Sequence, residues 1–208
     1  MSGPDQPAAP PVLYTIVCGA GPASSAHRLV ECAQRQGWDV WVIATRVVVD
    51  YFLAPGILER VSGHPVRTDF RSPGAPGGLP RAAAAVVAPA TYNTINKWAA
   101  GIADTFALST LAELTGASVP VGVLPFVNEA FAANRVFHRS VEALRGEGVR
   151  VLLGPGQFVP YAAGAGEEAA ARFPWNLVVD AVRPDLPSIH RVEAGTHGGK
   201  RRPQRWPE

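Results

Sequence analysis

Short apolar runs alternate with longer segments of helical periodicity along most of this chain. The runs show little polar alternation, and most of them end at a glycine or a proline. Continuous apolar runs of this kind are typical of parallel strands that are covered on both faces of a sheet. The strands that this pattern predicts cover residues 12–18, 39–44, 83–88, 119–124 and 149–153.

Apolar residues at helical spacing occupy the segments between these runs. After the first predicted strand they recur along one face of a helix, and Gly37 follows as a helix-ending residue. The residues of this face are Ala26, Leu29, Val30 and Ala33. The predicted helices cover residues 22–36, 55–61, 91–114 in two pieces around Gly101, 129–145 and 175–182.

Two further features complete the predicted elements. The helix predicted over 129–145 is expected to turn Phe131, Val136, Val141 and Leu144 inward. Residues 68–80 and 154–166 are rich in glycine or proline and lack periodicity, so they are predicted to be loops.

The alternation of strands and helices predicts an α/β protein. We expect a single Rossmann-like, flavodoxin-like domain of three layers, in which helices cover both faces of a mostly parallel sheet. In such sheets ligands bind beyond the carboxyl ends of the strands. Those ends are residues 19–21, Thr45, 89–94 and 125–128, and the functional residues are expected there.

Composition narrows the class of protein. The 208 residues are 47% hydrophobic and 17% charged. A chain this apolar can bury a core, which excludes wholesale disorder, and no apolar run is long enough to span a membrane. Cys18 and Cys32 are too few for a disulfide framework or a four-cysteine zinc site, so we predict no metal site. These features predict a cytoplasmic protein with reduced thiols.

Positive charge gathers at the end of the chain. Residues 183–208 contain six Lys or Arg against three Asp or Glu and carry +3, while residues 1–182 carry −1. A nearly neutral body argues against nucleic acid binding. We expect a flexible arm over 1–11, a folded domain over 12–182 and a basic, disordered tail over 183–208, with polyanion contact by the tail as the alternative.

The turn after the first strand, Gly19-Ala20-Gly21, is a candidate phosphate site. Small residues let backbone N–H groups approach an anion at the start of a helix. The turn lacks the third glycine of a dinucleotide fingerprint and the lysine of a Walker loop, so a plain tight turn is an equal alternative. Thr45 would offer its hydroxyl to the same phosphate, or would instead begin a helix as its N-cap.

The segment after the third strand carries more polar groups. Ala90, Thr91, Tyr92, Asn93 and Thr94 combine small residues with an amide and hydroxyls at the start of a helix. Such a turn suits an extended planar ligand, such as a flavin ring. The alternative is a capped helix start in which Asn93 is satisfied locally.

At this point longer stretches of the sequence resemble one family. APATYNTINKWAAGIAD is similar to the Pro-Ala-Ser-Ala-Asn-Thr signature of the flavin-containing cysteine decarboxylases. That family includes phosphopantothenoylcysteine decarboxylases, lantibiotic decarboxylases and, more distantly, flavin prenyltransferases. VIATRVVVDYFLAPGILERVSGHPVRTD, VPVGVLPFVNEAF and LRGEGVRVLLGP resemble other family segments in the same order, so the resemblance covers residues 12–155.

The resemblance implies FMN, bound without a covalent link at a subunit interface of a homo-oligomer, often a trimer or a multiple of trimers. Asn128 matches the motif asparagine that binds the substrate carboxylate in decarboxylases. The resemblance also implies phosphate-binding and flavin-lining residues. These cofactor-binding residues are Gly19, Ala20, Gly21, Thr45, Ala90, Thr91, Tyr92, Asn93 and Thr94.

The chain also departs from the family. Decarboxylating members carry a catalytic histidine in the region that corresponds to 68–80, which contains none here. His64, further upstream, is the candidate replacement, with a plain surface histidine as the alternative. Val127 and Phe131 stand where the motif has methionines, and no cysteine follows Cys32, where some members use one as a proton donor. Cys18 and Cys32 are expected to be small core residues.

The sequence therefore predicts an FMN-binding flavoprotein. We expect flavin-dependent redox or decarboxylation chemistry on a small-molecule or peptide thiol that resembles cysteine, with Asn128 and His64 as candidate catalytic residues. Two alternatives stay open because the family histidine is missing. One is an FMN-binding protein with another redox or prenyltransferase-like activity, and the other is a non-catalytic partner subunit.

Overall fold

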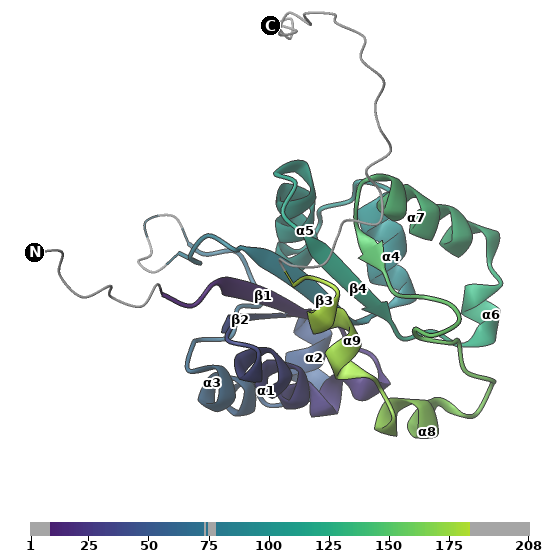
Figure 1. Ribbon diagram of the computed structural model, residues 1–208, viewed down its shortest axis with the longest axis horizontal. Helices are drawn as coiled ribbons and strands as arrows, with labels where there is room; N and C mark the ends of the chain where they lie inside the picture. Colours follow the sequence, from purple (N-terminus) through teal and green to yellow (C-terminus); the bar gives the residue numbers. More distant parts are fainter. Residues whose placement is uncertain (1–8, 73, 75–77, 184–208) are drawn as a thin grey trace, which may run out of the picture.

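The central feature of the structure is a parallel sheet of five strands in the order β2-β1-β3-β4-β5. The structure is a computed structural model, and it describes residues 9–72, 74 and 78–183. The sheet runs diagonally through the view of Figure 1. Its strands are β1 (Val12–Val17), β2 (Asp39–Ala44), β3 (Ala84–Ala90), β4 (Val121–Pro125) and β5 (Arg150–Val151).

Burial explains why the apolar runs become these strands. Every residue of β3 and of β4 is buried, as expected for central strands that are covered on both faces. The five predicted strands are confirmed, with shifted ends at all of them except β2. β4 begins at Val121 rather than at residue 119, and β5 keeps only two of the residues predicted over 149–153.

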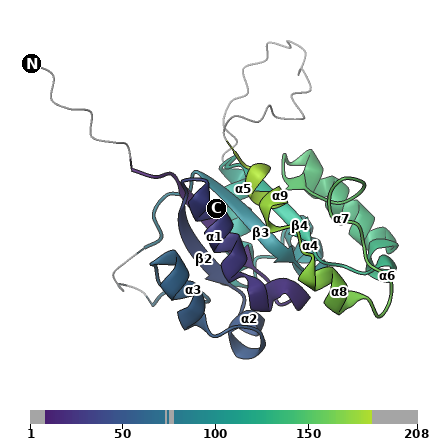
Figure 2. The same ribbon diagram turned by 60° about the horizontal axis from the view of Figure 1, so that its bottom comes forward.

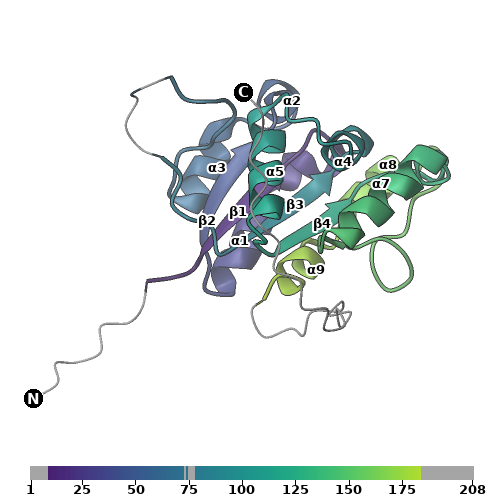
Figure 3. The same cartoon turned by 90° about the horizontal axis from the view of Figure 1, so that it is seen from above.

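Helices cover both faces of the sheet and form the predicted three layers. In Figure 1, α4, α5 and α7 lie above the sheet and α1, α3 and α9 lie below it. Figure 2 brings α1 forward over the strands, and Figure 3 shows α5 and α7 on the opposite face. These helices are α1 (His27–Arg35), α3 (Pro55–Ser62), α4 (Tyr92–Ala99), α5 (Phe106–Gly116), α7 (Arg135–Gly146) and α9 (Trp175–Asp180).

The strand order contains one switch point. The chain adds β2 on one side of β1, and then places β3 and β4 on the other side of β1. The order in which strands are added therefore reverses between β1 and β3, although all strands stay parallel. In sheets of this order the crevice at the carboxyl ends of the strands on either side of the reversal is the usual ligand site. The fold class predicted from the sequence is therefore confirmed, and it points to the ends of β1 and β3.

Two predicted helices are divided in the structure. Residues 22–36 form a 3-10 turn, η1 (Gly21–Ser25), followed by α1. Residues 129–145 form α6 (Glu129–Ala132) and then α7, because the Asn134 side chain accepts a hydrogen bond from the N–H of Val136 and restarts the helix. The break leaves Phe131 on α6, which has no buried residue, and Val136 lies off the buried face of α7, which contains Phe137 and Val141. The prediction that Phe131 and Val136 face inward is therefore wrong. They are 48% and 44% exposed, while Val141 and Leu144 are buried.

Two short helices were not predicted. α2 (Arg46–Tyr51) carries three consecutive valines, a β-branched run that has no helical periodicity. α8 (Gly166–Ala171) has no buried residue and so has no apolar face in its sequence. It begins at the last residue of the segment that was predicted to be a loop.

Some sequence predictions lie outside the described residues. Most of the predicted arm over 1–11 and nearly all of the predicted tail over 183–208 fall there. Within the part of the chain that the structure describes, no helix is both long enough and apolar enough to cross a bilayer.

Candidate functional site

Backbone hydrogen bonds bring the predicted functional segments to one edge of the sheet. The Thr45 N–H donates to Val17 at the end of β1, over 2.9 Å. The Cys18 N–H donates to Pro89 of β3 over 3.2 Å, and the Phe126 N–H donates to Ala90 over 2.9 Å. The segments that follow β1 to β4 therefore meet at the carboxyl edge, on both sides of the switch point.

The turn Gly19-Ala20-Gly21 needs glycine at both ends because other groups approach its backbone closely. A Cβ on Gly19 would lie 2.5 Å from Val47 Cγ1, and a Cβ on Gly21 would lie 3.1 Å from Phe126 Cε1. The chain then enters η1. A main chain stripped of side chains in this way can reach an anion directly.

Thr45 provides the observation that tests for a ligand at this turn. It stands at the N-cap position of α2, yet its side chain makes no capping hydrogen bond. Its Oγ1 is enclosed and has no hydrogen-bond partner among the described residues. An enclosed hydroxyl without a partner is costly unless a ligand supplies one. A phosphate oxygen fits this requirement. The alternative that Thr45 is a helix N-cap holds for its backbone position, but its hydroxyl does not cap the helix.

The segment after β3 uses most of its own hydroxyl groups. Thr91 caps α4, because its Oγ1 accepts from the N–H of Thr94 over 3.1 Å, and the two hydroxyl oxygens lie 2.9 Å apart. Thr94 also donates to the Sγ of Cys18 over 3.4 Å, which ties α4 to β1. Asn93 is exposed, and its side chain makes no hydrogen bond within the described residues. The structure therefore does not show the local partner that the capped-helix alternative expects for Asn93.

Cys18 lies beneath this site as a buried thiol. Burial raises the pKa of the Cys18 thiol, and hydrogen bonds from Thr94 and Thr91 oppose that rise only partly. Cys18 therefore keeps its proton at neutral pH and does not act as a nucleophile. The prediction that Cys18 and Cys32 are buried is confirmed.

Asn128 is the N-cap of α6. Its Oδ1 accepts from the N–H of Phe131 over 2.9 Å, which fixes the side-chain oxygen at the helix start. Among the described residues the Asn128 side chain makes no other hydrogen bond, so its Nδ2 group remains available as a donor. The arrangement can bind a carboxylate through that amide.

Aromatic rings lie near Asn128, and of these Tyr161 was not predicted from the sequence. Tyr92 stacks on Phe131, with ring centroids 4.7 Å apart, and on Phe137 at 5.6 Å. Asn128 pairs with Tyr161 in a parallel bridge, and the Tyr161 ring lies 4.7 Å from that of Phe126. Burial raises the pKa of the Tyr161 phenol, which keeps it neutral. No pattern in the sequence indicates Tyr161, whereas Tyr92 and Phe131 are visible as departures from the family motifs.

Comparisons with known proteins agree with this geometry. The sequence model of the family described as "Flavoprotein" matches residues 8–186. The chain belongs to the flavoprotein family. No curated protein matches it.

Solved structures resemble this flavoprotein over most of its length. The FMN-dependent cysteine decarboxylase SpaF is 25% identical, with a TM-score of 0.62, over 78% of this chain and 98% of that chain. The cypemycin decarboxylase CypD is 20% identical, with a TM-score of 0.63, over 85% and 92%. AnUbiX, solved in complex with FMN and dimethylallyl pyrophosphate, is 13% identical, with a TM-score of 0.58, over 68% and 77%. The family and SpaF support the prediction of FMN, while CypD and AnUbiX support the fold.

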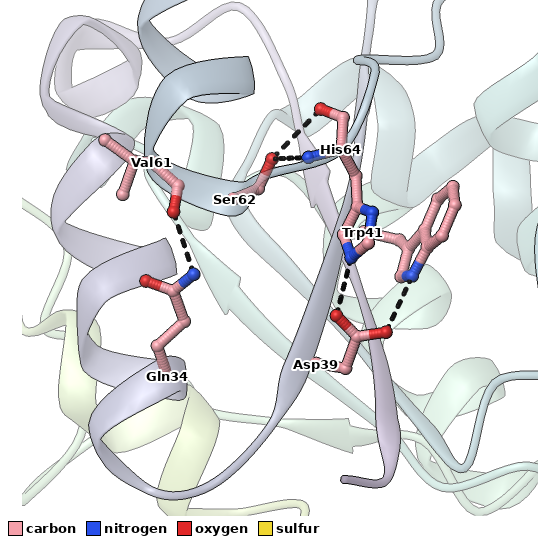
Figure 4. Close-up of polar contacts among 6 residues, drawn as sticks. All are labelled: Gln34, Asp39, Trp41, Val61, Ser62 and His64. Carbon is pink, nitrogen blue, oxygen red and sulfur yellow. Dashed lines mark hydrogen bonds and ion pairs between the residues drawn. The ribbon is translucent and has the colours of Figure 1, made fainter. Parts of the chain in front are cut away.

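His64 lies at the opposite edge of the sheet from the other candidate residues of the flavoprotein. Its Nε2 lies 2.6 Å from Oδ1 of Asp39, the first residue of β2, and its ring stacks on Trp41 with centroids 4.0 Å apart (Figure 4). Thr45 follows the last residue of β2, about 20 Å along the strand at a rise of about 3.3 Å per residue. The structure therefore does not bring His64 together with Asn128 within one protomer.

Replacing His64 with alanine is expected to lower stability without affecting flavin binding. The change removes the stack on Trp41 and the hydrogen bond to Asp39, both partly exposed, at a cost of about 1 kcal/mol in the free energy of unfolding. Urea unfolding and FMN titration measure the two quantities. His64→Phe, which keeps the stack, should lose less stability. Loss of activity at unchanged stability would instead return His64 to the list of catalytic residues.

Proposed function

We propose that this flavoprotein binds FMN at the carboxyl edge of its sheet and oxidatively decarboxylates a thiol substrate that resembles a C-terminal cysteine. The observation that carries the proposal is the enclosed, unpartnered hydroxyl of Thr45 beside the glycine turn, on the same edge as the free amide of Asn128. The family supplies the flavin, and SpaF supplies the precedent for the substrate.

Different residues would bind the FMN phosphate, the flavin ring and the substrate carboxylate. Gly19 and Gly21 would hold the FMN phosphate through their main-chain N–H groups, since the Ala20 N–H already donates to Cys18 over 2.9 Å and would only shape the turn. Thr45 would donate its hydroxyl to the same phosphate. Ala90 and Asn93 would face the flavin, whereas Thr91 acts indirectly by capping α4 and Thr94 by its hydrogen bond to Cys18. Asn128 would donate from Nδ2 to the substrate carboxylate and orient it until CO₂ leaves.

The chemistry requires an oxidant besides these residues. A C-terminal cysteine loses two hydrogens and CO₂, and an enethiol remains. When bound, FMN supplies the two-electron oxidation and accepts both hydrogens. The chain contributes position and a neutral amide at the carboxylate. The substrate carboxylate loses its charge as CO₂ forms. An ion pair with a cation would stabilise the charged carboxylate before the reaction and so raise the barrier, whereas a neutral amide binds it less strongly. An amide at this position therefore suits decarboxylation.

One observation favours a second candidate, an FMN-binding protein that does not decarboxylate. Residues 68–80 contain no histidine, and His64 lies at the far edge of the sheet. The Asn128 amide is not a base, and burial raises the pKa of the Tyr161 phenol, so neither group provides a base at neutral pH. In this case FMN would still bind through Thr45 and the glycine turn, and cysteine peptides would not react.

The experiment separates the two candidates. The purified protein is titrated with FMN and then mixed without oxygen with a peptide that ends in cysteine. Decarboxylation predicts one flavin reduced per peptide that loses CO₂ and two hydrogens, seen by absorbance and mass spectrometry. FMN binding without either change supports the second candidate. A protein that does not bind FMN excludes both.

Thr45→Val tests the residue that carries the proposal. The change keeps the shape of the side chain and removes the hydroxyl, so FMN affinity is expected to fall about 10-fold. Fluorescence titration with FMN measures it. Thr115→Val is the matched control, because Thr115 bonds to Leu111 within α5 and should leave the affinity unchanged. Equal affinities for all three proteins would place the phosphate elsewhere.

A further inference from the structure

The two family-motif positions at which this chain carries an aromatic ring are in contact with each other. Tyr92 stands where the family signature has alanine, and Phe131 stands where the family has methionine. In the structure their rings stack at 4.7 Å with an interplanar angle of 27°. Tyr92 also packs against the core, whereas Phe131 lies on α6, which has no buried residue.

Buried residues hold this pair from behind. Phe137 of α7 is fully buried and stacks on Tyr92 at 5.6 Å and 19°. Thr91 and Asn128 fix the first turns of the two helices that carry the rings. Packing and the two helix caps therefore hold the Tyr92 and Phe131 rings in defined positions. Phe131 nevertheless remains 48% exposed.

The pair also lies beside the amide that is proposed to bind the carboxylate. The Phe131 N–H donates to Oδ1 of Asn128, so the ring begins within the same helical turn as that amide. On the other side, Tyr161 pairs with Asn128 on neighbouring chain segments, and paired residues direct their side chains to the same face. A carboxylate held by Asn128 would therefore have aromatic rings next to it.

We propose that Tyr92 and Phe131 form an aromatic wall that selects substrates with an aromatic group next to the terminal cysteine. This inference rests on the proposed function for the position of the carboxylate. A residue preceding the cysteine lies within reach of rings that adjoin Asn128, and aromatic pairs gain beyond simple burial. A preceding glycine or an acidic residue gains nothing from such a wall.

Binding and turnover are measured separately to test the wall. The FMN-loaded protein receives acetyl-tryptophanyl-cysteine or acetyl-glycyl-cysteine, and kcat/KM is measured for each. Isothermal titration with the unreactive serine analogues, which keep the carboxylate and lack the thiol, gives the affinities. The tryptophanyl compounds are expected to be favoured about 10-fold in both measurements. Selective binding without turnover would overturn the proposed function and keep the wall.

Variants decide whether these rings are responsible. Tyr92→Ala combined with Phe131→Met restores the family residues and keeps the N–H that Asn128 accepts, so the preference should fall to about 2-fold or less. Phe131→Met alone keeps an apolar side chain and changes one residue. It provides the same test if the double variant does not fold. Ile102→Ala removes another exposed apolar side chain, beyond the far end of α4, and should keep the preference. Equal affinities in the parent protein, or a preference that survives the double change, would overturn the inference.

Discussion

Changing Asn128 to aspartate is expected to lower kcat/KM for decarboxylation about 100-fold and to leave FMN affinity unchanged. The aspartate keeps an oxygen for the Phe131 N–H, so the cap of α6 remains. It replaces the only free donor of the side chain with a charged oxygen, which repels the substrate carboxylate. Steady-state kinetics with a cysteine-ended peptide, together with thermal unfolding, provide the measurement.

The chain contains a matched control for this change. Asn134 caps α7 as Asn128 caps α6, with its Oδ1 accepting from the Val136 N–H over 2.9 Å. Asn134→Asp should therefore alter stability as Asn128→Asp does, while its kcat/KM stays within about twofold of the parent. Asn128→Ala adds the loss of the cap, about 1 kcal/mol in the free energy of unfolding. Full activity in Asn128→Asp would show that another group binds the carboxylate.

The strands could be predicted from the sequence because burial on both faces leaves a direct trace in it. β3 is a run of small and β-branched residues that are all buried. The helices that escaped prediction lack such a trace. α2 is held by its position after β2 and by the Val48 N–H that donates to Thr45, rather than by an apolar face. Tertiary position outweighs local preference in an element this short.

The site was predictable in location and less so in detail. Carboxyl ends of parallel strands meet by construction, so Gly19, Thr45 and Asn128 could be assigned to one edge from their places in the sequence. His64 could not be placed, because the chain after α3 returns alongside β2, where Arg67 pairs with Ile43. That pairing puts His64 at the start of β2. No local pattern records a contact of this kind.

The aromatic wall was missed for a related reason. The helical spacing predicts Phe131 on the buried face of one long helix, whereas the structure breaks that helix at Asn134. The Asn-x-x-Phe spacing that caps α6 was visible in the sequence, as was the asparagine that caps α7. Recognising both caps would have separated the helices and left Phe131 exposed beside Tyr92.

Gly19→Ala is the second change with a large expected effect, a fall in FMN affinity of about 100-fold. The new Cβ would lie 2.5 Å from Val47 Cγ1 and 3.0 Å from Val47 Cβ. Rotation of the valine relieves the first contact and leaves the second, so α2 must shift. That shift moves Thr45, which immediately precedes α2 and is proposed to bind the phosphate. Fluorescence titration with FMN measures the affinity, and thermal unfolding measures the accompanying strain.

A second substitution separates the displaced hydroxyl from a general loss of structure. Adding Val47→Ala removes the nearer of the two clashing atoms, so Gly19→Ala/Val47→Ala should regain about 10-fold of the lost affinity. Gly116→Ala on α5 meets no atom within 4 Å and should bind FMN as the parent protein does. Gly19→Ala could lower the unfolding temperature and still bind FMN with unaltered affinity. That result would mean that binding of the FMN phosphate does not depend on the glycine turn together with Thr45. Recovery in the double variant would instead trace the effect to the position of α2.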